Sequence, residues 1–131
     1  MNGKKPAAAT PHALRVKRVY AAPDEDDGLR ILVDRLWPRG VAKQNARIDL
    51  WLRDVAPSND LRRRFHGHPD QWAAFNAAYA EELARAPALP LADSIVEKLA
   101  ASIVTLLYAA RDERRNNAVA LRDWLAARMR E

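Results

Sequence analysis

The 131-residue sequence contains no cysteine, only four glycines and 7% aromatic residues. The absence of cysteine excludes disulfides, cysteine nucleophiles and cysteine-ligated zinc or iron–sulfur centres. The chain has no glycine-rich phosphate loop and no nucleophile-elbow motif, which removes several large enzyme classes. No group of side chains has the spacing of a metal site, so we expect neither a metal nor a cofactor.

Long hydrophobic runs are also absent. The longest apolar run, residues 103–110, is far too short to span a bilayer. In residues 1–13, the apolar stretch is interrupted by Pro6, Thr10, Pro11 and His12 well before it reaches the length of a secretory core, and we interpret this segment as a flexible N-terminal extension. We therefore expect no membrane partner, a cytoplasmic location and a single domain over residues 14–131.

The charge is positive and unevenly distributed. The chain has 22 basic and 17 acidic residues, and the surplus lies in residues 1–66, which carry 14 basic and 8 acidic ones. A basic balance favours an anionic partner. Seventeen of the basic residues are arginine, whose planar fork of donors suits phosphate or carboxylate. Abundant alanine alongside arginine is equally consistent with a GC-rich genome, so this bias alone decides nothing.

Three segments have strand-like patterns. Residues 14–20 alternate apolar and basic side chains, and residues 29–33 form a second apolar stretch. Residues 102–108 are apolar and β-branched with helical patterns on both sides, which predicts a central strand buried on both faces. The long connection before this strand favours a parallel crossover from the second strand, whereas the pairing of the first two strands is left open.

The intervening segments have helical spacing. A layered α/β domain follows, with a sheet of about three mostly parallel strands packed with about five helices. The first predicted helix covers residues 48–55 and ends before Pro57, the second is capped by Ser58, and a longer third helix begins at Pro69. A loop with prolines at 87 and 90 follows. The fourth helix then begins at Asp93 or Ser94, and a terminal helix is capped by Asp112.

A dense polar cluster, residues 34–40, follows the second strand. Ligands of open α/β sheets bind at the carboxyl ends of parallel strands, where this cluster is expected to lie. Arg35 and Arg39 could grip an anion, with Asp34 as an acid–base or orienting group. In the alternative interpretation, Asp34 pairs with a neighbouring arginine and Trp37 fills the core.

A second polar cluster follows the third strand. Arg111 and Asp112 come directly after it, and Asn116 follows one turn later. If the second and third strands are parallel, both clusters meet at one edge and form one pocket. A purely structural helix-capping role for Asp112 is the favoured alternative. The candidate residues are Asp34 and Asp112 as catalytic groups and Arg35, Trp37, Arg39, Arg111 and Asn116 as ligand-binding groups.

Two further features have weaker functional interpretations. His66 and His68 flank Gly67 without a third ligand at a familiar spacing, so we interpret them as loop residues. The run of three arginines at 62–64 could contact nucleic-acid phosphates, although a solvated helix face is the more frequent meaning of such a run.

Four segments together resemble a known family. Residues 16–20, 27–40, 56–58 and 104–112, in this order, are similar to the YeaO-like family of the DUF488 type, over about residues 15–127. The resemblance implies a small cytoplasmic α/β domain without an established activity. Relatives often carry a histidine where this chain has Arg115. Replacing a titratable imidazole by a permanent cation argues against acid–base catalysis from that position.

Three functions from different classes remain open on the sequence alone. The first is a site for an anionic small molecule, phosphate- or carboxylate-bearing, with or without catalysis. The second is nucleic-acid binding or regulation, motivated by the basic first half of the chain. The third is a non-catalytic interaction module. The sequence leaves the oligomeric state and the identity of any ligand open.

Overall fold

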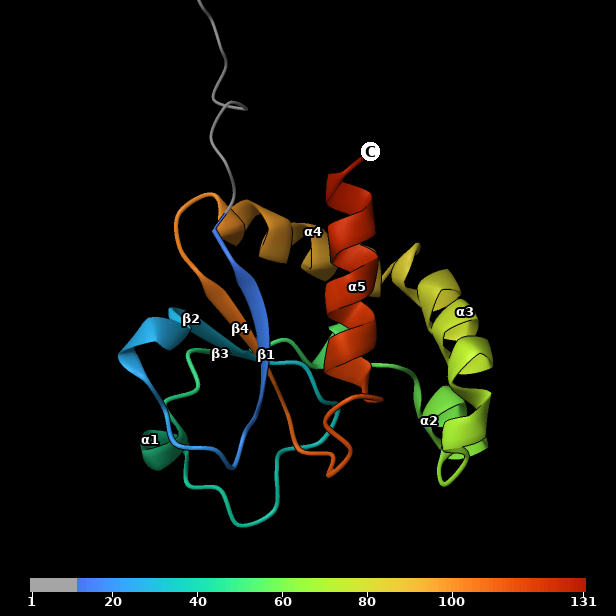
Figure 1. The fold of residues 1–131 in the computed structure, drawn as a ribbon, viewed down its shortest axis with the longest axis horizontal. Helices are drawn as coiled ribbons and strands as arrows, with labels where there is room; N and C mark the ends of the chain where they lie inside the picture. The colour runs from blue at the N-terminus through green and yellow to red at the C-terminus, as the bar shows by residue number, and fades with distance from the viewer. Residues whose placement is uncertain (1–11) are drawn as a thin grey trace, which may run out of the picture.

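The computed structural model describes residues 12–131, and a four-stranded sheet lies at its centre (Figure 1). The strand order is β1-β4-β2-β3, and every adjacent pair is parallel. The predicted α/β class and mostly parallel sheet are confirmed, with four strands in place of about three. The strands are β1, Leu14–Arg18; β2, Leu29–Leu32; β3, Leu50–Trp51; and β4, Val104–Tyr108.

The strand β4 is central and buried, as its composition predicts. All five of its residues are buried. It pairs with β1 from Leu14 opposite Val104 onward and with β2 from Leu29 opposite Val104 onward. The first two strands therefore lie on either side of β4 and do not pair with each other. Because all of them run in the same direction, the segments that follow β2 and β4 leave the sheet at one edge.

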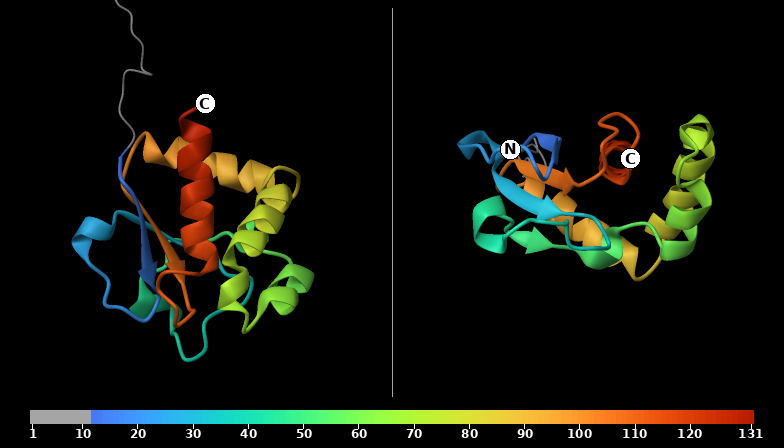
Figure 2. Two further views of the ribbon diagram at one scale, coloured as in Figure 1. Left: turned by 45° about the vertical axis from the view of Figure 1, so that its right-hand side comes forward. Right: turned by 90° about the horizontal axis from the view of Figure 1, so that it is seen from below.

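Helices cover one face of the sheet and a loop covers the other. Figure 2 shows α3, α4 and α5 gathered on one side of the strands, with α1 on the other. Alternate strand residues divide accordingly: Leu106 packs in the cluster shared with these helices, whereas Leu107 packs against the segment that carries Trp37 and Ile48. The helices are α1, Lys43–Ala46; α2, Asn59–Phe65; α3, Trp72–Leu83; α4, Ala88–Leu99; and α5, Asn117–Met129.

Two predicted helix starts are confirmed in outline. The Ser58 hydroxyl accepts a hydrogen bond from the Leu61 amide over 3.1 Å and so caps α2. Pro69 opens a short 3-10 turn that runs directly into α3. These two signals predict the helix starts correctly because a cap and an initial proline act within one turn of the chain and do not depend on distant residues.

The helix predicted over residues 48–55 is wrong. This segment forms β3 followed by a 3-10 turn, Arg53–Val55. The Leu52 amide donates to the Leu32 carbonyl over 3.0 Å, and the Trp51 indole donates to the Asp34 carbonyl over 2.8 Å. Pairing with β2 satisfies backbone hydrogen bonds of this segment. A helix of only two turns is too short to be stable by itself, so the strand pairing prevails over the helical spacing.

The predicted loop at residues 87–90 and the predicted start at Asp93 or Ser94 are also wrong. The helix α4 already begins at Ala88, so Pro90 lies in its first turn. Amide groups in the first turn have no partner within the helix, and a proline there removes no hydrogen bond.

The predicted extension, residues 1–13, lies outside the described residues except for its last two. The His12 amide donates to the Leu99 carbonyl over 2.9 Å, and the Ala13 carbonyl accepts from the Val104 amide over 3.1 Å. Within residues 12–131 no helix is long and apolar enough to cross a membrane.

Candidate functional site

A cavity of about 790 Å³ lies at the carboxyl edge of the sheet. Three stretches of chain supply most of its lining: residues 34–39 after β2, residues 109–117 after β4, and the hairpin of α2 and α3. Tyr20, Ala56 and Pro57 complete it. Its volume is in the range of pockets that hold drug-sized ligands. All seven sequence-predicted residues line it, namely Asp34, Arg35, Trp37, Arg39, Arg111, Asp112 and Asn116.

The Asp34 carboxylate, just after β2, is bonded to the chain after β4 and to the first residue of α5. Its Oδ2 accepts from the Ala109 amide over 2.9 Å, and its Oδ1 accepts from Asn117 Nδ2 over 3.0 Å. The suggested ion pair with a neighbouring arginine does not form within residues 12–131. Burial raises the pKa of Asp34, although the bonds from Asn117 and Ala109 and the charge of Arg62 oppose this shift.

The Arg35 side chain has structural partners. Its Nε donates to the Pro57 carbonyl over 3.0 Å, and its Nη2 donates to the Ala56 carbonyl over 3.0 Å. Its Nη1 also lies 3.6 Å from the Asp54 carboxylate. The guanidinium fork therefore ties the exit of β2 to the chain just before α2, which leaves few donors for a ligand.

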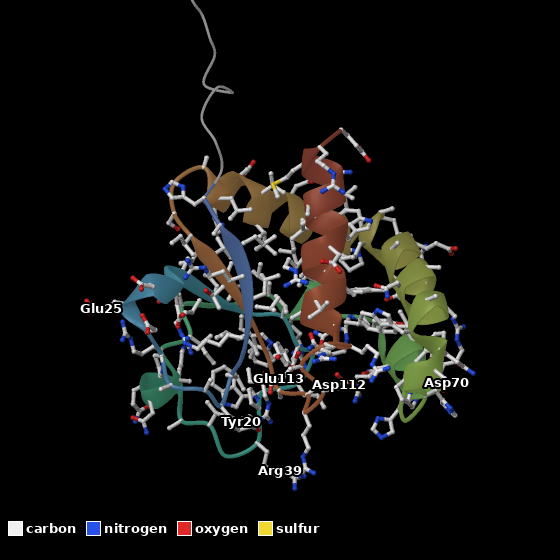
Figure 3. The ribbon with its side chains drawn as sticks, viewed as in Figure 1. Tyr20, Glu25, Arg39, Asp70, Asp112 and Glu113 are labelled. Carbon is white, nitrogen blue, oxygen red and sulfur yellow. The ribbon has the colours of Figure 1, made fainter. Side chains whose placement is uncertain are left out.

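Arg39 and Arg111 are less constrained. Both are exposed, and neither side chain forms an ion pair within residues 12–131. The loop of Arg39 is anchored through its backbone, because Tyr20 Oη donates to the Arg39 carbonyl over 2.9 Å. Figure 3 shows Tyr20, Arg39 and Asp112 at the same end of the molecule. Two guanidinium groups are thus presented at the cavity with their donors available.

Trp37 packs against the core, as the alternative interpretation expects, and its ring also borders the cavity. Its indole donates to the Val41 carbonyl over 2.8 Å, and its ring meets Trp51 edge to face with centroids 5.4 Å apart. Trp37 fixes the shape of the loop that carries Arg39.

The predicted capping role of Asp112 is wrong. The cap of α5 is Asn116, whose Oδ1 accepts from the Val119 amide over 2.9 Å. Asp112 closes the preceding turn, because its Oδ1 accepts from the Arg114 and Arg115 amides, each over 3.0 Å. These backbone bonds, together with the adjacent Arg115 cation, lower the pKa of Asp112. Seven residues, 109–115, separate β4 from the cap, and sequence spacing does not reveal where this loop ends.

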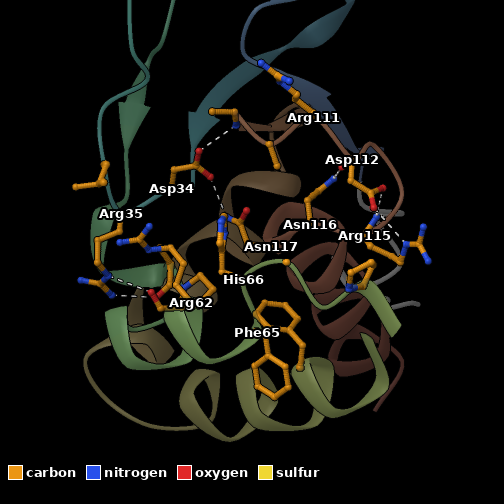
Figure 4. A pocket seen from close by; sticks show the side chains of 18 of the residues that line it. Asp34, Arg35, Arg62, Phe65, His66, Arg111, Asp112, Arg115, Asn116 and Asn117 are labelled. Carbon is orange, nitrogen blue, oxygen red and sulfur yellow. Dashed lines mark hydrogen bonds and ion pairs between the residues drawn. The ribbon is translucent and has the colours of Figure 1, made fainter. Parts of the chain in front are cut away.

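Asn116, predicted to bind ligand, is 5% exposed and has both ends of its amide engaged. Besides capping α5, it donates through Nδ2 to the Asp112 carbonyl over 2.9 Å. Figure 4 shows Asp112, Asn116 and Arg115 on one side of the cavity, with Arg35 and Arg62 on the opposite side. Asn116 therefore shapes this side of the cavity while its polar atoms remain satisfied by the protein.

One whole wall of the cavity, the α2–α3 hairpin, was not predicted from the sequence. Its spacing indicates inward-facing residues, but only the tertiary fold places the hairpin beside the strand ends. The three arginines of α2 separate here: Arg62 lines the cavity, Arg63 pairs with Asp60 at 2.8 Å, and Arg64 lies 4.9 Å above the Phe65 ring. The lining residues contributed by the hairpin are Arg62, Phe65, His66, Gly67, His68, Pro69, Trp72 and Phe75.

His66 and His68, interpreted as loop residues, do lie in the loop between α2 and the turn before α3. They also line the cavity. No group of three or more histidine, aspartate or glutamate side chains within residues 12–131 is arranged to hold a metal ion. The polar chemistry of the cavity thus consists of guanidinium, imidazole, amide and carboxylate groups.

The fold and the cavity define the chain as a small α/β protein with a candidate ligand site at the ends of its parallel strands. It belongs to the YeaO-like DUF488 family: the model described as the inactive DUF488-N3 subclade matches residues 13–131. The uncharacterized protein YeaO of Escherichia coli K12 is 43% identical over 114 residues, covering 86% of this chain and 96% of the relative.

A mycobacterial relative is similarly close. The uncharacterized protein Rv3073c of Mycobacterium tuberculosis H37Rv is 40% identical over 115 residues, covering 88% of this chain and 95% of the relative. No solved structure matches the chain. Since these relatives are themselves uncharacterised, any ligand must be inferred from the chemistry of the cavity.

Proposed function

We propose that the chain binds an anionic small molecule, bearing phosphate or carboxylate, in the cavity at the carboxyl edge of the sheet. The observation that carries this proposal is that arginines from three distant segments line one cavity. Arg39 follows β2, Arg62 lies on α2, and Arg111 and Arg115 follow β4. A surface that gathers this much like charge is stabilised by an anion that bridges it.

The arginines have different roles in this proposal. Arg39 and Arg111 supply the exposed forks that grip the anion, while Arg62 contributes charge from the opposite wall. Arg35 holds the wall itself through its bonds to the Ala56 and Pro57 carbonyls. The start of α5 also faces this edge, and its dipole favours negative charge. Binding is expected to weaken as salt rises, because exposed charges are screened.

The two predicted catalytic carboxylates are unequal candidates. Asp34 is the better suited to proton transfer, because burial in a cavity raises its pKa. Asp112 is bound by two amides and an arginine, which stabilise its charged form. The description of the matching subclade as inactive, together with Arg115 in place of an imidazole, favours a pocket that holds its ligand unchanged. We therefore assign Asp34 as an orienting acceptor.

An NMR titration with phosphate, sulfate and acetate tests this function. We expect amide shifts concentrated in residues 34–40 and 109–117. Arg111→Gln is expected to weaken binding about tenfold, because a charge-assisted pair contributes on the order of 1.5–3 kcal/mol.

Arg114→Gln is the matched control, since Arg114 lies in the same loop and is exposed but does not line the cavity. If Arg114→Gln weakens binding as much as Arg111→Gln, or if no anion shifts these amides, the proposed function is wrong.

A further inference from the structure

The hairpin wall of the cavity is aromatic. Trp72 stacks on Phe75 with ring centroids 5.6 Å apart and an interplanar angle of 17°, and Phe65 meets Phe75 edge to face at 5.8 Å. All three rings line the cavity and are only partly buried. A simple inorganic anion makes no use of such a surface, whereas a planar ring stacks on it favourably.

The sheet side of the same cavity offers hydrogen-bond acceptors. Each oxygen of Asp34 accepts one hydrogen bond from the protein, from Ala109 or Asn117, and retains capacity for another. Arg62 of the hairpin and Asp34 of the sheet edge border the same cavity (Figure 4). The cavity thus combines an aromatic surface, a carboxylate acceptor and cationic forks.

On the basis of the proposed anion site, we infer that the ligand is a nucleoside monophosphate. Its base stacks on the aromatic wall of Phe65, Trp72 and Phe75. Its phosphate lies among the arginines, and a sugar hydroxyl donates to Asp34. A cavity of about 790 Å³ accommodates a molecule of this size, whereas phosphate alone would leave the aromatic wall without a partner.

Calorimetric titration of the unmodified protein with a graded series of ligands tests this inference. The series is AMP and UMP, ribose 5-phosphate, inorganic phosphate, adenosine, and a single-stranded trinucleotide. We expect the mononucleotides to bind at least about tenfold more tightly than ribose 5-phosphate, because stacking of one base contributes about that factor.

A pair of tryptophan variants localises the base. Trp72→Leu is expected to reduce AMP affinity about tenfold while leaving the affinity for ribose 5-phosphate unchanged. Trp124→Leu is the matched control, since Trp124 is also half-buried but lies on α5 outside this cavity. Circular dichroism checks that each variant is folded. If Trp72→Leu does not fold, the ligand series measured with the unmodified protein still tests the nucleotide inference.

The outcomes separate the two proposals. Equal affinity for AMP, ribose 5-phosphate and inorganic phosphate overturns the nucleotide inference and leaves the anion site intact. Equal affinity for adenosine and AMP overturns the anion site, and failure of every ligand to bind overturns both. A trinucleotide that binds at least tenfold more tightly than AMP overturns the assignment to a free nucleotide, in favour of a nucleic-acid strand.

Discussion

Arginine has opposite surroundings at the two ends of β2. At the amino end, Arg30 is 2% exposed; its Nε donates to the Arg47 carbonyl over 3.0 Å and its Nη2 to the Ala46 carbonyl over 2.8 Å. The third guanidinium nitrogen, Nη1, forms an ion pair with the buried Asp27 carboxylate. At the carboxyl end, Arg39 and Arg111 are exposed and form no ion pair within residues 12–131.

The same residue type therefore has a structural role at one end of the sheet and is available for binding at the other. A buried arginine whose three side-chain nitrogens are all hydrogen-bonded acts as an internal cross-link, and its removal leaves buried acceptors and a carboxylate without that partner. An exposed arginine at a cavity adds little to stability but is available to a ligand. Stability should therefore depend on the amino end of β2, and binding on its carboxyl end.

The largest expected effect is on Arg30. Arg30→Met removes one of the two cations paired with the buried Asp27 carboxylate among residues 12–131, leaving Lys17 at 3.1 Å and the Asp24 amide at 3.0 Å, and frees the Ala46 and Arg47 carbonyls. We expect a loss of about 4 kcal/mol in the free energy of unfolding, measured by urea denaturation. Arg111→Met is the control and should change it by less than about 0.5 kcal/mol. Equal losses in the two variants would abolish the contrast.

A second comparison uses one glycine near each end of β2. Gly28 precedes the strand at a φ of 64°, and a Cβ there would lie 2.2 Å from the Ile103 carbonyl oxygen. Gly40, in the loop beyond its far end, has a φ of 75° but no atom within 4 Å of such a Cβ.

We therefore expect Gly28→Ala to cost about 3 kcal/mol and Gly40→Ala about 1 kcal/mol, which is the strain of the left-handed backbone alone. Thermal unfolding of both variants measures the difference. A Gly40→Ala variant as unstable as Gly28→Ala would contradict the view that the carboxyl edge is open.

The smallest effect is a difference in pH dependence between two aspartates. Burial opposes ionisation of Asp27, but hydrogen bonds from the Asp24 amide, Lys17 and Arg30 outweigh it and lower its pKa. Its contribution to stability is present above the ordinary value of 3.8 and is lost as pH falls through the lowered pKa. Asp34 has a raised pKa, so its contribution is present below 3.8 and is lost as pH rises through the raised value.

Urea denaturation of the unmodified protein, Asp27→Asn and Asp34→Asn between about pH 3 and pH 7 measures these signs. The stability advantage over Asp27→Asn should grow with pH, and the advantage over Asp34→Asn should shrink, each by on the order of 1 kcal/mol or less. Slopes of the same sign would show that the two carboxylates have similar surroundings.

Local patterns account for most of what could be predicted. The apolar and β-branched composition of residues 102–108 predicted a central strand, and all five residues of β4 are buried. The parallel pairing of β2 with β4 then brings the clusters after these two strands to one edge. Every predicted site residue lines the resulting cavity. This worked because strand composition is a local signal, and because a long connection between two neighbouring strands favours a parallel crossover.

The engagement of individual side chains could not be predicted in this way. Arg35 and Arg39 are four residues apart in one motif, yet Arg35 bonds to the Ala56 and Pro57 carbonyls while Arg39 is exposed. Likewise the apolar residues in and around β3 have helical spacing, yet β3 pairs with β2 at the edge of the sheet. These outcomes depend on partners some 20 residues away, which sequence spacing does not encode.

The sequence by itself determined the α/β class, the buried central strand and the positions of polar clusters just after two strands. These features follow from local periodicity and from the chemistry of single residues. Only the tertiary structure decided that the α2–α3 hairpin supplies an aromatic wall to the cavity, that Asn116 rather than Asp112 caps α5, and which arginines are available. Each of these depends on contacts between distant segments, and the burial of apolar surface that creates such contacts is non-directional.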